Sequence, residues 1–170
     1  MSELMARMGE LCASSTGEGL VALGLGSCIG LVLLDRRKGV AGLAHIVLPA
    51  ADGHSDLNPM KFADNAVPEL LNRVVALGGR KAMLEAVLVG GASMFAGAGS
   101  TLEVGARNAA AVTEQLKKHR VKIAATATGG TRGRTVRVDP STGTVTFREA
   151  GAKDQQLFPA LSSRVLQEVA

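Results

Sequence analysis

The sequence predicts a mixed domain of the α/β or α+β class, and three observations lead to this prediction. About seven short runs are apolar or alternating, as β-strands are, and two longer segments repeat their apolar residues at helical spacing. The chain has 170 residues, a length that suits one domain with its own core. Hydrophobic residues form 46% and charged residues 20% of the chain, which excludes wholesale disorder.

The N-terminal third is predicted to be rich in strands. Residues 8–13 fit either a short strand or part of an N-terminal helix, and the sequence leaves this open. Residues 20–23 read as a short apolar strand. The apolar runs at residues 29–34 and 40–48 are separated by a charged turn, so we expect them to pair as a hairpin of buried strands.

A helix is predicted over residues 61–77, ended by a pair of glycines. Its apolar positions recur at helical spacing: Val67, Leu70, Leu71, Val74 and Leu77.

The second half continues with a buried strand at residues 84–89, a helix at 105–119 and a strand at 121–127. Alternating residues on both sides of a turn at 139–143 predict a hairpin with one polar face. Residues 1–7 and about 150–170 are weakly patterned, and we expect these ends of a single domain over residues 1–170 to fray.

Composition narrows the classes of function. Only 2% of residues are aromatic, which argues against proteins that stack bases on aromatic side chains. The longest uncharged apolar stretch, residues 20–34, is short of the roughly 20 residues that a membrane-spanning helix needs. Two cysteines cannot build a disulfide framework, and charged residues interrupt any secretory signal at the N-terminus. We therefore expect a cytoplasmic protein.

Basic residues gather in one part of the chain. Seven of them lie between Lys117 and Arg137 with no acidic residue among them, and the net charge of the chain is +4. One interpretation is a docking surface for an acidic partner, and the other is an ordinary solvated surface. No motif that binds a nucleic-acid groove accompanies these charges, so nucleic acid is not expected as a partner.

Cys28 and His45 form the one pair of residues that suggests chemistry. If the runs at residues 29–34 and 40–48 pair, both residues lie near the same end of a sheet. A thiol becomes a good nucleophile beside a base, and small residues such as Gly26 and Ser27 let backbone N–H groups turn inward to hold an oxyanion. The alternatives are a small core cysteine and a structural histidine, because spacing does not show that the two side chains face the same way.

Several motifs in the same order resemble the CheD family of chemoreceptor glutamine deamidases. The glycine-rich run up to Cys28 and the segment Gly-Leu-Ala-His-Ile-Val-Leu-Pro at residues 42–49 carry the resemblance. Residues 61–64 resemble a Lys-Tyr-Ala-Asp segment of the family, with Phe in place of Tyr. Further matches are found at residues 90–95, 104–108 and 128–134, so that the resemblance covers roughly residues 8–148.

The resemblance implies a specific activity. Members of the family convert glutamines on the cytoplasmic helices of bacterial chemoreceptors to glutamates, with a cysteine nucleophile and a histidine base that fall on Cys28 and His45 of this chain. It implies stacked mixed sheets flanked by two main helices, similar to the catalytic domains of deamidating toxins. It implies no metal or organic cofactor and no insertion into the membrane. Some members bind the phosphatase CheC, and the residues Ser93, Met94 and Phe95 resemble part of the surface that recognises substrate or partner.

One position departs from the family. Members can carry a threonine six residues before the cysteine as a third catalytic group, and this position is Ala22 in the present chain. Either a backbone carbonyl near residues 21–23 orients His45, as a carbonyl does in the toxins, or the enzyme is slower. Because Ala22 lacks this group, one alternative is an adaptor that binds receptor or CheC without significant catalysis. Another alternative is a different amidohydrolase or a methylesterase, which would share the Cys–His pair.

Overall fold

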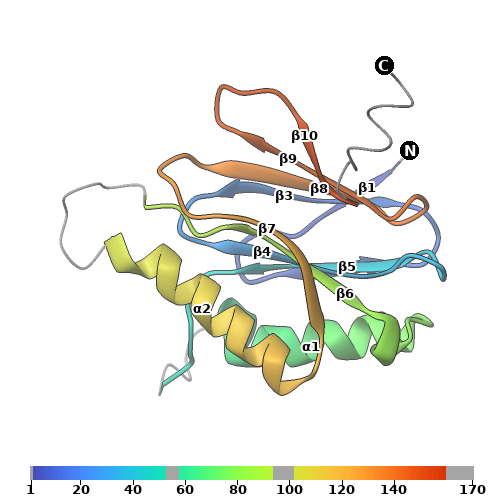
Figure 1. Cartoon of the computed structure of the whole chain (residues 1–170). Coiled ribbons are helices and arrows are strands. Elements are labelled where there is room, and N and C mark those ends of the chain that lie inside the picture. The colour runs from blue at the N-terminus through green and yellow to red at the C-terminus, as the bar shows by residue number, and fades with distance from the viewer. Residues whose placement is uncertain (1, 53–57, 94–101, 160–170) are drawn as a thin grey trace.

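The computed structural model describes residues 2–52, 58–93 and 102–159. It consists of three layers, in which two five-stranded sheets are stacked and two helices cover the outer face of one of them (Figure 1). The expected α+β fold with stacked mixed sheets and two main helices is therefore confirmed.

The first sheet is the one that neither of the two described helices covers (Figure 1). Its strands in spatial order are β1 (Glu3–Met5), β3 (Gly19–Leu25), β8 (Arg134–Asp139), β9 (Thr144–Glu149) and β10 (Gln155–Phe158). The strands β1 and β3 are parallel, and the other neighbours are antiparallel.

The second sheet lies between the first sheet and the helices. Its strands in spatial order are β2 (Leu11–Ser14), β5 (Val40–Ile46), β4 (Ile29–Asp35), β6 (Glu85–Gly90) and β7 (Lys122–Thr128). The helices are α1 (Ala63–Ala76) and α2 (Leu102–Lys118), and two short 3₁₀ helices, η1 (Pro59–Lys61) and η2 (Lys81–Met83), precede α1 and β6.

The predicted hairpin is confirmed as β4 and β5, which pair antiparallel with Ile29 opposite Ile46. The ambiguous residues 8–13 are a turn followed by β2, which forms the edge of the second sheet beside β5. Ten strands are present in the described residues instead of about seven, because β1, β2 and β10 are only three or four residues long and carry little periodicity. Both β1 and β10 lie in the segments that were expected to fray.

The core consists of two layers on the two sides of β4. Leu31 and Leu33 face the helices, where they pack with α1 and α2, whereas Val32 and Leu34 face the first sheet. A strand that is buried on both faces reads as a continuous apolar run, and all seven residues of β4 are buried. Residues of even number in β4 therefore face the layer between the two sheets.

Within the described residues, neither helix combines the length and the apolar character that crossing a membrane requires.

An ion pair between the buried Asp35 and the partly exposed Arg80 lies at the end of β4. The carboxylate of Asp35 accepts hydrogen bonds from Arg80 Nε at 2.8 Å, from Arg80 Nη2 at 2.9 Å and from the Arg80 backbone N–H at 3.0 Å. The Asp35 side chain is only 2% exposed. The hydrogen bonds from Arg80 lower the pKa of Asp35 to about 2, although burial acts in the opposite direction.

We expect Arg80→Ala to destabilise the fold by about 2 kcal/mol at pH 7, because it removes the guanidinium from the buried Asp35 carboxylate, which keeps hydrogen bonds from the backbone N–H groups of residues 38 and 80. Urea denaturation of the unchanged protein and of Arg80→Ala measures this difference in the free energy of unfolding. Arg80→Lys is expected to have an intermediate stability, because lysine keeps the charge but not the paired hydrogen bonds.

The same difference is expected to depend on pH. Because the pKa of Asp35 is lowered in the folded state, its contribution is complete above the ordinary pKa of an aspartate and is lost as the pH falls from about 4 to about 2. Equal urea midpoints for the two proteins at pH 7 would show that the pair contributes nothing.

Candidate active site

Cys28 ends the loop of residues 26–28 that joins β3 to β4, which we call the nucleophile loop. Its side chain belongs to the layer between the sheets, together with Ala6, Leu25 and Val32, and the residue is 8% exposed. Burial raises the pKa of the Cys28 thiol, and the backbone N–H of Cys28 itself acts in the opposite direction. The net shift favours the protonated thiol over the thiolate.

His45 lies on β5 and faces the same layer as Cys28. In the β4–β5 register His45 is directly opposite Gly30, and Gly30 is on the same face as Cys28, two residues along. His45 also binds Ala6, a member of that layer. The structure thus resolves what the spacing of the two residues left open. No hydrogen bond joins the two side chains among the described residues.

The hydrogen bond of His45 fixes which ring nitrogen carries the proton. The Nδ1 atom lies 3.0 Å from the carbonyl oxygen of Ala6, and a carbonyl oxygen can only accept a hydrogen bond. Nδ1 is therefore the protonated nitrogen, and Nε2 of the neutral ring is left with a lone pair. Nε2 is buried and has no hydrogen-bond partner in the described part of the chain.

Burial also lowers the pKa of His45, although the Ala6 carbonyl and the charge of Glu10 act in the opposite direction. The net shift favours the neutral ring over the imidazolium. A neutral imidazole with a free Nε2 is the form that accepts a proton.

The backbone carbonyl that orients His45 does not lie in residues 21–23, where it was expected from the sequence. Ala22 is completely buried between the sheets and offers no side-chain acceptor. A backbone carbonyl does orient His45, but it belongs to Ala6 and not to residues 21–23. The segment of residues 21–23 holds Ala6 instead of His45, since the carbonyl of Val21 accepts a hydrogen bond from the Ala6 N–H at 2.9 Å.

Three donors hold the carbonyl groups of the nucleophile loop. They are Ala92 N–H to Gly26 at 2.7 Å, Asn108 Nδ2 to Ser27 at 2.9 Å and Gly91 N–H to Cys28 at 2.8 Å. The N–H groups of the same three loop residues donate to no carbonyl in the described residues. A loop whose carbonyls are engaged and whose N–H groups bind no carbonyl is suited to hold an oxyanion.

Gly90, the last residue of β6, has to be a glycine. Its φ is +117°, and a Cβ atom there would lie 2.2 Å from the carbonyl oxygen of Cys28. Any side chain would therefore push the nucleophile loop away from β6.

The predicted recognition residues are only partly described. Ser93 follows the end of β6, is half-buried, and donates its backbone N–H to the carbonyl of Gly130 at 2.9 Å. Met94 and Phe95 lie outside the described residues.

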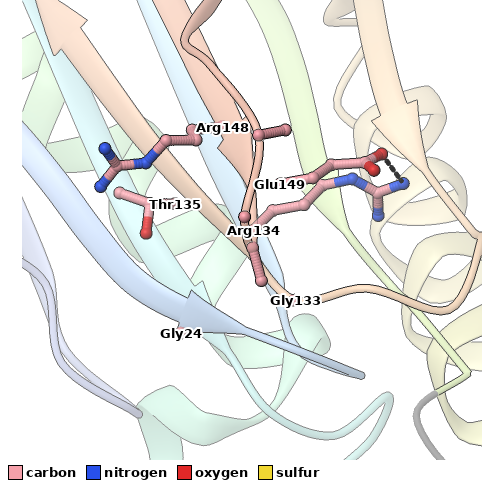
Figure 2. Close-up of a pocket in the computed structure, with 9 residues that line it drawn as sticks. Gly24, Gly133, Arg134, Thr135, Arg148 and Glu149 are labelled. Atoms are coloured by element: carbon pink, nitrogen blue, oxygen red, sulfur yellow. Dashed lines mark hydrogen bonds and ion pairs between the residues drawn. The ribbon is translucent and has the colours of Figure 1, made fainter.

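The basic segment does not form one surface. Arg134 is buried; it donates to the carbonyls of Gly90 and Gly129 at 3.1 and 2.8 Å and pairs with Glu149 (Figure 2). Arg137 pairs with Glu3 at 3.3 Å. The exposed bases are Lys117, Lys118, Arg120, Lys122 and Arg132.

A pocket of about 370 Å³ lies beside Arg134 and includes neither Cys28 nor His45. Arg148 and Thr135 also line it and point away from the Arg134–Glu149 pair (Figure 2). Arg134, on β8 of the first sheet, therefore connects that sheet to the turn at Gly90 through its hydrogen bonds to the carbonyls of Gly90 and Gly129.

Two residues of the site were not predicted from the sequence. Ala6 acts through its backbone, and nothing in its side chain signals that role. Asn108 gave a usable signal, because it is a polar residue on the apolar stripe of α2, one and two turns before the buried Val112 and Leu116.

Known proteins are similar to this chain over most of its length. The family model described as CheD chemotactic sensory transduction matches residues 47–149, more than half of the chain. A Methanococcus maripaludis protein named probable chemoreceptor glutamine deamidase CheD is 40% identical over 85% of this chain and 94% of its own length. A Clostridium kluyveri protein of the same name is 40% identical over 89% of this chain and 95% of its own.

One solved structure, of a Neisseria meningitidis protein of family DUF152, is similar with a TM-score of 0.46 and 12% identity, over 77% of this chain and 64% of that one. The family model and the curated relatives together give the assignment: this chain belongs to the CheD family.

Proposed function

We propose that this chain, as one deamidase domain over residues 1–170, converts glutamine side chains of chemoreceptors to glutamates. The names of its relatives support this substrate and this reaction. The observation that carries the chemistry is the hydrogen bond from His45 Nδ1 to the Ala6 carbonyl. It leaves Nε2 as a base on the same face of the second sheet as the Cys28 thiol.

In the proposed mechanism, His45 Nε2 accepts the proton of Cys28, and the thiolate sulfur attacks the carboxamide carbon of a glutamine. The C–N bond then breaks, and the imidazolium returns its proton to the departing ammonia. The product of this half-reaction is a thioester. A water molecule that gives a proton to Nε2 attacks the thioester, releases glutamate and restores the thiol.

The oxyanion of each tetrahedral intermediate is proposed to lie against the N–H groups of Gly26 and Ser27, with that of Cys28 beside them. The carbonyls of Gly26 and Ser27 are bound by Ala92 and Asn108, so the loop N–H groups need no rearrangement during the reaction. One such donor is typically worth about 3 kcal/mol of transition-state stabilisation.

The resting pair is proposed to be neutral. Burial raises the pKa of Cys28 and lowers that of His45, and both shifts oppose a thiolate–imidazolium ion pair. Proton transfer therefore accompanies attack on the substrate and does not precede it.

The setting of the enzyme follows from this substrate. We propose that it acts in the cytoplasm on the helices of chemoreceptors, with the phosphatase CheC as a further partner and Ser93, Met94 and Phe95 as part of the recognition surface. The exposed bases around the end of α2 are suited to acidic helices, and such an attraction would weaken with salt.

The adaptor alternative is based on Ala22, which lacks the hydroxyl of the family's third group. Ala6 supplies an acceptor for His45 in its place, and this favours catalysis over the adaptor. A methylesterase would use the same pair, and its product would come from an ester and not from an amide.

We expect Cys28→Ala to abolish conversion of glutamine to glutamate, with a loss of more than about 10³-fold, because no other group replaces the nucleophile. The measurement is mass spectrometry of individual glutamines in a chemoreceptor cytoplasmic fragment incubated with the purified protein.

The control for this variant is Cys12→Ala, which removes the other cysteine and is expected to keep full activity. If the intact protein converts no glutamine on several receptors from the same cell, the adaptor becomes the better interpretation.

A second prediction concerns the neutral pair. In a Cys12→Ala background, the rate of Cys28 alkylation by iodoacetamide is expected to keep rising beyond pH 9, because the thiol pKa is raised. A preformed ion pair would instead give a plateau below about pH 7. The background is needed although the pKa of Cys12 is raised to about 11, because Cys12 would also react at the highest pH.

A further inference from the structure

Asn108 joins the two segments that carry the proposed catalytic residues. Its Nδ2 donates to the carbonyl of Ser27 in the nucleophile loop at 2.9 Å and to the carbonyl of Val47 at 2.9 Å. Ser27 is the neighbour of Cys28, and Val47 follows His45 by two residues. One side-chain amide therefore spans the nucleophile loop and the strand of the base.

The orientation of this amide is fixed by its partners. Both partners are carbonyl oxygens, which accept only, so the NH₂ group must face them and the oxygen Oδ1 must face away. Asn108 is completely buried, and Oδ1 has no hydrogen-bond partner among the described residues. Burying a polar atom without a partner costs free energy, so the position is not explained by packing alone.

The helix that carries Asn108 is brought close by a glycine. A Cβ atom at Gly105, one turn before Asn108, would lie 2.4 Å from the carbonyl oxygen of Gly91. Gly91 is the residue whose N–H binds the carbonyl of Cys28. The helix α2 therefore sits directly on the turn that holds the nucleophile loop, and this contact places Asn108 within reach of both carbonyls.

We propose that Asn108 is a positioning residue for the deamidation: by binding the Ser27 and Val47 carbonyls together, it sets the distance between Cys28 and His45. The inference rests on the proposed function. A nucleophile and a base act as a unit only while their separation is held, and a displacement of about 1 Å can cost on the order of 10²-fold in rate.

The test compares Asn108→Ala with Val112→Ala, which removes buried volume one turn further along the same face of α2 and keeps both hydrogen bonds of Asn108. We expect Asn108→Ala to lower kcat by about 10- to 100-fold with KM within about twofold. Val112→Ala is expected to lower thermal stability while keeping kcat within about twofold of the unchanged protein. Asn108→Ser is measured in the same way and replaces Asn108→Ala if that variant does not fold.

A second readout needs no receptor. Alkylation of Cys28 by chloroacetamide at pH 8, in a Cys12→Ala background, is compared between Asn108→Ala and His45→Gln. If Asn108 sets the distance, its loss slows alkylation nearly as much as the loss of His45 does. If Asn108 had only a structural role, the alkylation rate of Asn108→Ala would not fall to that of His45→Gln.

The outcomes separate the inference from the proposed function. If His45→Gln leaves alkylation unchanged, the Cys–His pair fails and the positioning role of Asn108 fails with it. If the unchanged protein converts no glutamine, the proposed function fails, and the alkylation comparison still decides the role of Asn108. If the unchanged protein deamidates and Asn108→Ala keeps its kcat within about twofold, or if Val112→Ala loses as much kcat, the positioning role is overturned.

Discussion

The arrangement at His45 depends on one hydrogen bond, from Nδ1 to the carbonyl of Ala6. This bond selects the tautomer, leaves Nε2 as an acceptor and opposes the effect of burial on the pKa of the ring. The backbone of His45 is held in the same region, since its N–H donates to Glu10 and its carbonyl accepts from Gly9. The N-terminal segment thus acts as a clamp on the proposed base, and Val21 keeps Ala6 in place by binding its N–H.

The nucleophile loop is held from the opposite direction by groups that belong to the second half of the chain. The turn after β6 binds two of its carbonyls, and Asn108 of α2 binds the third. These contacts require very close approach of backbone to backbone, which is why Gly90 and Gly105 stand where any Cβ would collide with a carbonyl oxygen. The site therefore lies at the end of β4, between the N-terminal residues 6–10 that hold His45 and the turn at residues 90–92 that holds the nucleophile loop.

The parts of this structure that follow a periodic pattern were predictable from the sequence. The hairpin of β4 and β5 could be expected from two apolar runs around a charged turn, and this register brings Gly30 opposite His45. The Ala6 carbonyl could not be expected, because a backbone group carries no side-chain signal and lies 39 residues from its partner. The burial of Arg134 could not be expected for a related reason, since this residue is buried by contacts that no local pattern records.

A neutral resting pair has a chemical advantage for the proposed reaction. A thiolate formed from a thiol of raised pKa is a stronger nucleophile once its proton is removed, and it is also a poorer leaving group. In the tetrahedral intermediate this property disfavours return of the thiolate and favours loss of the nitrogen, provided that the nitrogen is protonated. In the proposed mechanism, His45 has just accepted the proton that this step needs. Burial of Cys28 therefore lowers the fraction of reactive thiolate at rest but directs the intermediate toward the thioester, as cleavage of an amide requires.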